Sequence, residues 1–165
     1  MPRSDGRLRK ILDCRMVNSE TMNQSIQMED VEHLRQLIQP EDFATTLDLR
    51  DAYHHVNVHS SLRPYFGFAF HDRICTYVGL PFGWNHSLYM FTKTLSVFIQ
   101  QIRKRLKVKI TSCIDDIPLL RPVKQELQTM TKQIAQFLKD LAWRLAPEKC
   151  RMIPHKWLKY LEEKQ

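Results

Sequence analysis

Two amphipathic stretches constrain the fold of this chain more than any other feature of its sequence. Residues 86–107 and 123–143 both repeat apolar side chains at helical spacing, which predicts two long helices with one buried face each. The first face consists of Leu88, Phe91, Leu95, Phe98, Ile99, Ile102 and Leu106. The second consists of Leu127, Met130, Ile134, Phe137, Leu138 and Leu141. Because a helix cannot cover its own apolar face, the chain must supply other elements to pack there.

Two short apolar segments predict strands that carry carboxylates. Residues 43–49 alternate their side chains as a strand does, and Asp48 lies near the end of that segment. Residues 110–120 predict two short strands about a tight turn at Asp115 and Asp116. The sequence therefore predicts acidic side chains at the ends of buried strands.

The remaining elements complete an α+β pattern. Residues 64–70 and 74–78 predict a hairpin, residues 29–39 predict a helix ended by Pro40, and residues 150–165 predict the start of a further strand. Strands and helices do not alternate regularly. We therefore expect an α+β fold with a small, mostly antiparallel sheet backed by two long helices.

Several functional classes are excluded. No apolar run reaches the roughly 18 residues of a membrane-spanning helix, and no apolar core follows the basic N-terminus as in a secretory signal. The four glycines form no phosphate-binding loop. The four cysteines include no CxxC pair, which disfavours a zinc site and a disulfide framework and predicts reduced thiols in an intracellular protein.

The charge balance favours a polyanionic partner, although weakly. The chain has 25 Lys and Arg against 18 Asp and Glu, a net charge of +7. Basic residues cluster at 7–10 and 103–109. The second cluster also fits the solvated C-terminal end of a helix, where cations suit the helix dipole.

The three aspartates suggest a metal site. Adjacent Asp115 and Asp116 repel each other, which raises one pKa unless a cation neutralises them. With Asp48 from a neighbouring strand they would suit Mg²⁺ or Mn²⁺, and two such ions about 4 Å apart serve phosphoryl transfer. Simpler interpretations remain open: Asp is common in turns, and Asp48 would also suit an exposed position on a one-sided sheet.

Five segments, in order along the chain from Arg7 to about Tyr160, together resemble a reverse transcriptase. They are Arg9–Arg15 with Asn18, Leu47–Tyr53, Leu80–Trp84, Cys113–Asp116 and Pro147–Cys150. Arg9–Arg15 with Asn18 resembles a fingers segment, and Leu47–Tyr53 resembles the first carboxylate motif of the palm. Leu80–Trp84 resembles the LPFG segment. Cys113–Asp116 resembles the xDD turn, and Pro147–Cys150 resembles the PEK motif. The details of Asp51–Tyr53 and Phe91–Lys93 are most similar to retroelements that encode a tyrosine recombinase, with long-terminal-repeat elements and pararetroviruses next.

The resemblance implies a reaction: a primer 3′-hydroxyl attacks the α-phosphate of a dNTP, on an RNA or DNA template, with two Mg²⁺ or Mn²⁺ ions. Asp48, Asp115 and Asp116 would hold the metals, with the Leu49 carbonyl as a further ligand. Lys149 would donate a proton to pyrophosphate.

The resemblance also implies residues that bind the nucleic acid and the nucleotide. The nucleotide set is Arg9 at the triphosphate, the backbone amides of Asp51 and Ala52, Tyr53 as a steric gate against a ribose 2′-hydroxyl, and Phe82. The template-primer set is Arg15, Gly83 and Trp84.

Domain assignment follows the same resemblance. We expect a single domain over 1–165, with partial fingers at about 1–42 and 60–83 and palm at about 43–59 and 84–160. Thumb, connection and RNase H sequences are not found, so we expect weak extension by this chain alone, and a partner protein or further domains could supply them.

Departures from the family pattern keep alternatives open. Cys113 replaces an aromatic residue, Pro118 removes a ladder donor from a strand, and Leu161-Glu162 replaces Leu-Gly. One alternative is a catalytically silent retroelement-derived scaffold or nucleic-acid-binding subunit. Another is an RNA-dependent RNA polymerase palm, although Tyr53 after Ala52 favours dNTP selection.

Overall fold

The structure is a computed structural model that describes residues 10–26 and 36–156. The chain forms two compact units. One consists of Met1–Ile26 with Ala52–Lys93, and the other of Gln27–Asp51 with Thr94–Gln165. The boundary between them falls within one long helix. Each unit is described by itself below.

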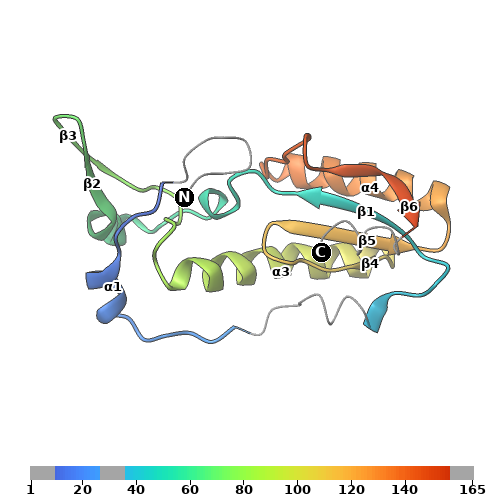
Figure 1. Ribbon diagram of the computed structural model, residues 1–165, viewed down its shortest axis with the longest axis horizontal. Helices are drawn as coiled ribbons and strands as arrows, with labels where there is room; N and C mark the ends of the chain where they lie inside the picture. The colour runs from blue at the N-terminus through green and yellow to red at the C-terminus, as the bar shows by residue number, and fades with distance from the viewer. Residues whose placement is uncertain (1–9, 27–35, 157–165) are drawn as a thin grey trace. The chain divides into compact units, whose positions relative to one another are not determined.

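The second unit is built on a four-stranded sheet. Its strands are β1 (Phe43–Asp48), β4 (Lys109–Ile110), β5 (Asp116–Arg121) and β6 (Arg151–Lys156), in the order β4-β5-β1-β6 (Figure 1). Every pairing in this sheet is antiparallel. β1 and β5 are almost completely buried, so the centre of the sheet is also the centre of the core.

Two helices carry the predicted apolar stripes. α3 spans His86–Leu106 and α4 spans Lys124–Asp140. α4 packs against β1, β5 and β6, and a buried hydrogen bond of 2.7 Å joins the hydroxyls of Thr45 and Thr131 across that contact. The predicted α+β fold with a small antiparallel sheet backed by helices is confirmed.

One residue of the predicted stripe is wrongly placed. Leu141 was expected on the buried face of the second helix, but it is 41% exposed. The reason is that α4 ends at Asp140 and the chain then turns through Ala142, which has a φ of 62°. Leu141 therefore leaves the helical register that the sequence pattern assumed.

The first unit contains a hairpin and short helices. Its elements are α1 (Arg15–Ser19), η1 (Ala52–His55), η2 (Ser60–Phe66), β2 (Gly67–Phe70) and β3 (Arg73–Thr76). The predicted hairpin is present, but its first strand begins at Gly67, because the residues before it form the 3₁₀ helix η2. The first eight residues of α3 also belong to this unit.

Most of the predicted helix at 29–39 lies outside the described residues, and so does the end of the predicted strand at 150–165, whose described part forms β6. No helix of the described ranges is long and apolar enough to cross a membrane.

Pro118 lacks a ladder donor, as expected, but it does not interrupt its strand. β5 continues through it to Arg121. The Pro118 carbonyl accepts a hydrogen bond from the Thr111 N–H at 3.2 Å, and the nitrogen of an extended residue points to the same side as its carbonyl. The nitrogen of Pro118 therefore faces away from β1 and toward Thr111. Thr111 lies just beyond the end of β4 at Ile110, so the pairing of β1 with β5 does not need a donor there.

We expect Pro118→Val to change the free energy of unfolding by no more than about 1 kcal/mol, since at most one hydrogen bond, to the Thr111 carbonyl, is gained. Leu119→Ala, at the neighbouring buried position, should cost about 2–5 kcal/mol. Urea denaturation of both variants tests this. A loss in Pro118→Val as large as that in Leu119→Ala would contradict this account of β5.

Candidate active site

The antiparallel pairing of β1 with β5 places two carboxylates opposite each other. Asp48 and Asp116 are direct cross-strand partners. The N–H of Leu49 donates to the Asp115 carbonyl at 2.9 Å, which makes Asp48 and Asp116 a non-hydrogen-bonded pair, the kind whose side chains lie closest. Opposed residues share a face of the sheet, so both carboxylates are on the same face.

A strained turn delivers the third carboxylate. The backbones of Cys113 and Asp116 bond to each other in both directions, at 2.9 and 3.1 Å, so Ile114 and Asp115 form the tip. The turn thus lies one residue earlier than predicted, because Asp116 already belongs to β5. Ile114 has a φ of 57°, a region that β-branched residues rarely adopt and that costs about 1–3 kcal/mol.

Asp48 is the buried member of the group. Its side chain is 8% exposed, so the alternative of an exposed sheet position is wrong. Its Oδ1 has no hydrogen-bond partner within the described residues, and its Oδ2 lies 3.5 Å from the Lys149 Nζ. Burial raises the pKa of Asp48 to about 6; Lys149 opposes this, and the charges of Asp115 and Asp116 add to it.

The turn that carries Lys149 is tied to the backbone of Asp48. The N–H of Ala146 donates to the Asp48 carbonyl at 2.9 Å, and the N–H of Asp48 donates to the Cys150 Sγ at 3.3 Å. Burial is the main cause of a raised pKa of the Cys150 thiol. Sequence analysis gave Cys150 no role, although it ends the PEK segment.

An ion pair holds the same turn from the other side. One nitrogen of the Arg50 guanidinium lies 2.8 Å from both carboxylate oxygens of Glu148. Both side chains are substantially exposed, so the pair contributes little to stability. The pair instead restricts geometry: Arg50 directly follows Leu49 and Glu148 directly precedes Lys149, so the pair links the two segments that carry these site residues. Sequence analysis missed this pair, because nothing in the spacing of two residues so far apart predicts their contact.

The donor types at this end of the sheet suit a hard divalent cation. Asp48 keeps a buried carboxylate oxygen without a partner among the described residues, and two more carboxylates lie on the adjoining strand and its turn, Asp116 in β5 and Asp115 just before it. The Leu49 carbonyl points toward the Asp115 side, as its N–H does. Nevertheless, the described residues contain no group of three or more His, Cys, Asp or Glu side chains arranged to hold a metal ion. The carboxylates thus fit a cation in donor chemistry and charge, but the described side chains do not form a complete coordination site.

In the first unit, the rings of Phe82 and Phe91 lie close to the predicted steric gate, Tyr53. The half-buried Tyr53 ring lies 4.6 Å from Phe82 and 5.5 Å from Phe91, measured between ring centroids. Tyr53 lies in η1, directly after the buried Ala52. The structure therefore brings Tyr53 and Phe82 together, as two of the predicted nucleotide-binding residues.

Gly83 lies where only glycine fits. Its φ is 115°, and a Cβ there would clash with the Leu12 carbonyl oxygen. The N–H of Leu12 donates to the Phe82 carbonyl, and the Asn18 amide donates to the Gly83 carbonyl at 2.9 Å. The segment around Asn18 is thus fastened to the LPFG loop, a contact that sequence analysis did not predict.

The other predicted site residues lie in varied settings. Trp84 packs its ring on Phe66 at 5.0 Å, and Arg15 is highly exposed and paired with Asp13 at 2.6 Å. Asp51 is half-buried with a φ of 51°. Arg9 lies outside the described residues.

Comparison with known proteins identifies the family. The model of the family described as reverse transcriptase (RNA-dependent DNA polymerase) matches residues 1–161. The Gag-Pro-Pol polyprotein of human T-cell leukemia virus 3 is 28% identical over 158 residues, and that of human T-cell leukemia virus 2 is 26% identical over 159. Each alignment covers 91% of this chain but only 11% of the polyprotein.

Solved structures agree on the fold. A foamy viral protease–reverse transcriptase in complex with double-stranded DNA superposes with a TM-score of 0.79 at 18% identity, over 93% of this chain and 26% of that one. A prototype foamy virus protease–reverse transcriptase mutant gives a TM-score of 0.76 at 22% identity, over 92% and 20%.

The raised pKa of Asp48 predicts a pH-dependent stability. The folded protein holds the Asp48 proton more tightly than the unfolded chain does, so this contribution to stability is present below about pH 4 and is lost as the pH rises through about 6. With metals chelated, Asp48→Asn should therefore raise the free energy of unfolding at pH 7 by about 1–3 kcal/mol, and change it little at pH 4.

Urea denaturation in EDTA at the two pH values measures this effect. Asp72→Asn, at an exposed hairpin position, is the matched control and should change neither value. If Asp48→Asn is instead less stable at pH 7, the ionised carboxylate is stabilising, and the account of its burial is wrong.

Proposed function

This chain belongs to the reverse transcriptase family, and on that premise we propose that it forms the core of an RNA-directed DNA polymerase that adds dNTPs to a primer 3′-hydroxyl. The observation that carries the proposal is the pairing of Asp48 with Asp116 beside the Asp115 turn. The buried Asp48 Oδ1 has no hydrogen-bond partner among the described residues, and two further carboxylates lie at the same end of the sheet. This arrangement suits a cation that the reaction requires.

The proposed metal ligands are Asp48, Asp115, Asp116 and the Leu49 carbonyl. Two Mg²⁺ or Mn²⁺ ions bound there would activate the attacking hydroxyl oxygen and stabilise the leaving one. The protein fixes the backbone of these ligands through the β1–β5 ladder and the strained turn at Ile114. The Asp48 side chain is further restricted by its burial.

Lys149 is the proposed proton donor to the leaving pyrophosphate. Its ammonium group lies beside Asp48 and remains half exposed, so it can reach both a carboxylate and a bound anion. The turn that carries it is held by the Asp48 backbone and by Glu148 with Arg50. These contacts fix the base of the side chain, and its end stays half exposed, where it could transfer a proton.

The nucleotide and the template would contact the remaining family positions. The proposed nucleotide set is Arg9, the amides of Asp51 and Ala52, Tyr53 and Phe82, and the proposed template-primer set is Arg15, Gly83 and Trp84. The foamy viral relative was solved with double-stranded DNA, which supports a nucleic-acid partner here, as does the net charge of +7. The four free cysteines suit a reducing, intracellular setting.

The domain division is part of the proposal. We assign partial fingers to about 1–42 and 60–83 and palm to about 43–59 and 84–160. The carboxylate centre then belongs to the palm and the hairpin β2–β3 to the fingers. The chain spans about a tenth of the length of its viral relatives, so thumb, RNase H or partner subunits belong to the proposal for the whole protein.

Asp115→Asn tests the centre directly. Removing one of the carboxylates proposed to bind the metal should weaken Mn²⁺ binding, measured by calorimetry, by more than about 100-fold. Template-directed primer extension by the full natural protein should fall at least as far, with an unchanged circular dichroism spectrum. Asp72→Asn is the control for the loss of one surface charge. Wild-type Mn²⁺ affinity in Asp115→Asn would refute the ligand assignment, and metal binding without extension by the wild type would favour the silent scaffold.

Tyr53→Ala tests sugar selection. A ring beneath the 2′ position excludes a hydroxyl by overlap, so its removal should raise rNTP incorporation relative to dNTP by roughly 10-fold or more. Tyr53→Phe keeps the ring against Phe82 and should keep the wild-type ratio. Single-nucleotide insertion with matched rNTP and dNTP measures both variants. An unchanged ratio in Tyr53→Ala removes this residue from the gate.

A further inference from the structure

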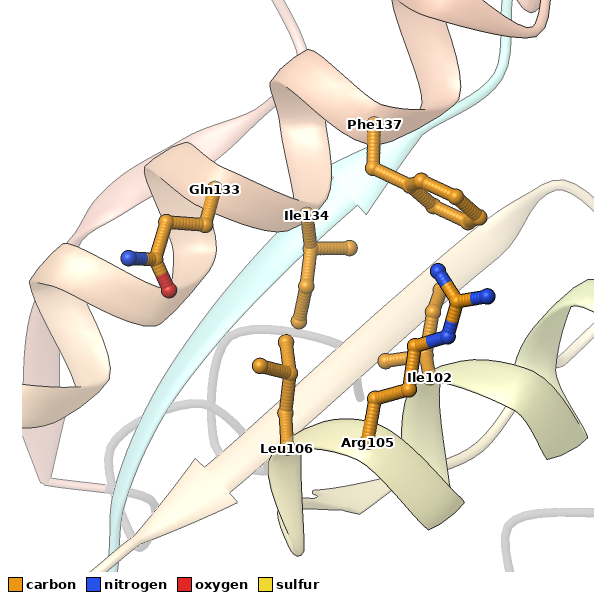
Figure 2. A pocket seen from close by; sticks show the side chains of 6 residues that line it. All are labelled: Ile102, Arg105, Leu106, Gln133, Ile134 and Phe137. Atoms are coloured by element: carbon orange, nitrogen blue, oxygen red, sulfur yellow. The ribbon is translucent and has the colours of Figure 1, made fainter.

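A cavity of about 320 Å³ lies between α3 and α4 in the second unit. It is lined by Ile102, Arg105, Leu106, Gln133, Ile134 and Phe137 (Figure 2). Figure 2 shows the two helices side by side, with strands of the sheet behind them. None of these residues belongs to the proposed polymerase reaction, so the cavity needs a separate explanation.

The lining forms two apolar ridges at helical spacing. Ile102 and Leu106 are four residues apart on α3, and Ile134 and Phe137 are three apart on α4. Ile102 and Ile134 are buried, at 3% and 1% exposed, whereas Leu106 and Phe137 are partly exposed and offer apolar surface to the side chains of an incoming helix. The shape therefore suits a helix laid along the groove.

Arg105 gives the groove a charge preference. It is the one charged residue among the six, and it has no hydrogen bond or ion pair within the described residues. Figure 2 shows its guanidinium reaching from α3 toward Phe137 on α4. Neighbouring Arg103 is engaged with the Ile110 carbonyl at 2.8 Å, whereas Lys104 and Lys107 are exposed. The groove therefore presents an available cation beside apolar side chains.

This combination selects among possible occupants. A nucleic-acid strand would need several cations along its phosphates, but the lining supplies one cation among mostly apolar groups. A segment with apolar side chains and an adjacent carboxylate matches both features, since Arg binds carboxylates with paired hydrogen bonds. We propose that the α3–α4 groove binds an acidic amphipathic helix of a partner polypeptide, whose carboxylate pairs with Arg105.

A designed peptide tests the recognition. The probe is a fluorescein-labelled, alanine-based helix with leucines at positions i, i+4 and i+7 and glutamate at i+3, and its partner replaces that glutamate by lysine. Fluorescence anisotropy should show that the wild-type protein prefers the glutamate peptide. Arg105→Glu should weaken this binding by about 10-fold or more and gain binding of the lysine peptide.

Two further variants make the result specific. Lys104→Glu changes the same charge at a neighbouring exposed position outside the lining, and it should preserve the peptide preference. Gln133→Trp should block the groove and abolish binding of both peptides, and because Gln133 is exposed the fold should persist, as circular dichroism would show.

Other outcomes overturn the proposal. Equal losses in Arg105→Glu and Lys104→Glu would show unspecific charge attraction, and no binding of either peptide would show that the groove does not take a helix. If the protein binds both peptides equally and decanoate displaces them from the groove, the natural occupant is a small amphiphile rather than a helix. Sedimentation experiments test for a second copy of this chain as the occupant. Self-association of the wild type that is lost in Gln133→Trp would show that a second copy occupies the groove.

Discussion

The register of β1 against β5 is the constraint on which the rest of the second unit depends. Side chains alternate along a strand, so a slip of one residue would move every side chain of β1 to the opposite face. The register is fixed by apolar partners such as Leu47 with Ile117 and Ala44 with Leu120, all four of them fully buried. The same register sets Asp48 opposite Asp116, where like charges are destabilising. The core thus holds in place a contact that opposes folding.

Two departures from local rules lie at this end of the sheet. The buried Asp48 has one carboxylate oxygen without a partner among the described residues, and Ile114 holds a backbone conformation that β-branched residues avoid. At the opposite end of β1 the buried Asp42 also has one such oxygen, but its other oxygen lies 2.8 Å from the Lys109 Nζ, whereas the ammonium of Lys149 lies 3.5 Å from Asp48. A weakly compensated carboxylate beside a strained turn is typical of functional sites, since the surrounding structure must offset their cost.

Periodic patterns predicted the elements well, whereas the contacts between distant residues escaped prediction. The stripes of α3 and α4 and the alternation of β1 are local properties, and the ordered motifs led to the reverse transcriptase family, which the family match confirms. The Arg50–Glu148 pair and the contact of Cys150 with Asp48 depend on how β6 and its preceding turn meet β1, which no local pattern encodes. The roles of the individual site residues remain predictions for the same reason.

Charge is distributed on two scales that favour different partners. The chain as a whole carries +7, which attracts a polyanion, whereas the end of β1 and β5 gathers three carboxylates against the single ammonium of Lys149. A phosphate that the whole chain attracts would therefore meet net negative charge at that point. Only additional positive charge placed between the carboxylates and the phosphate resolves this conflict. The local excess of negative charge is thus a reason, independent of the resemblance, why the proposed phosphate chemistry would need a cation at this site.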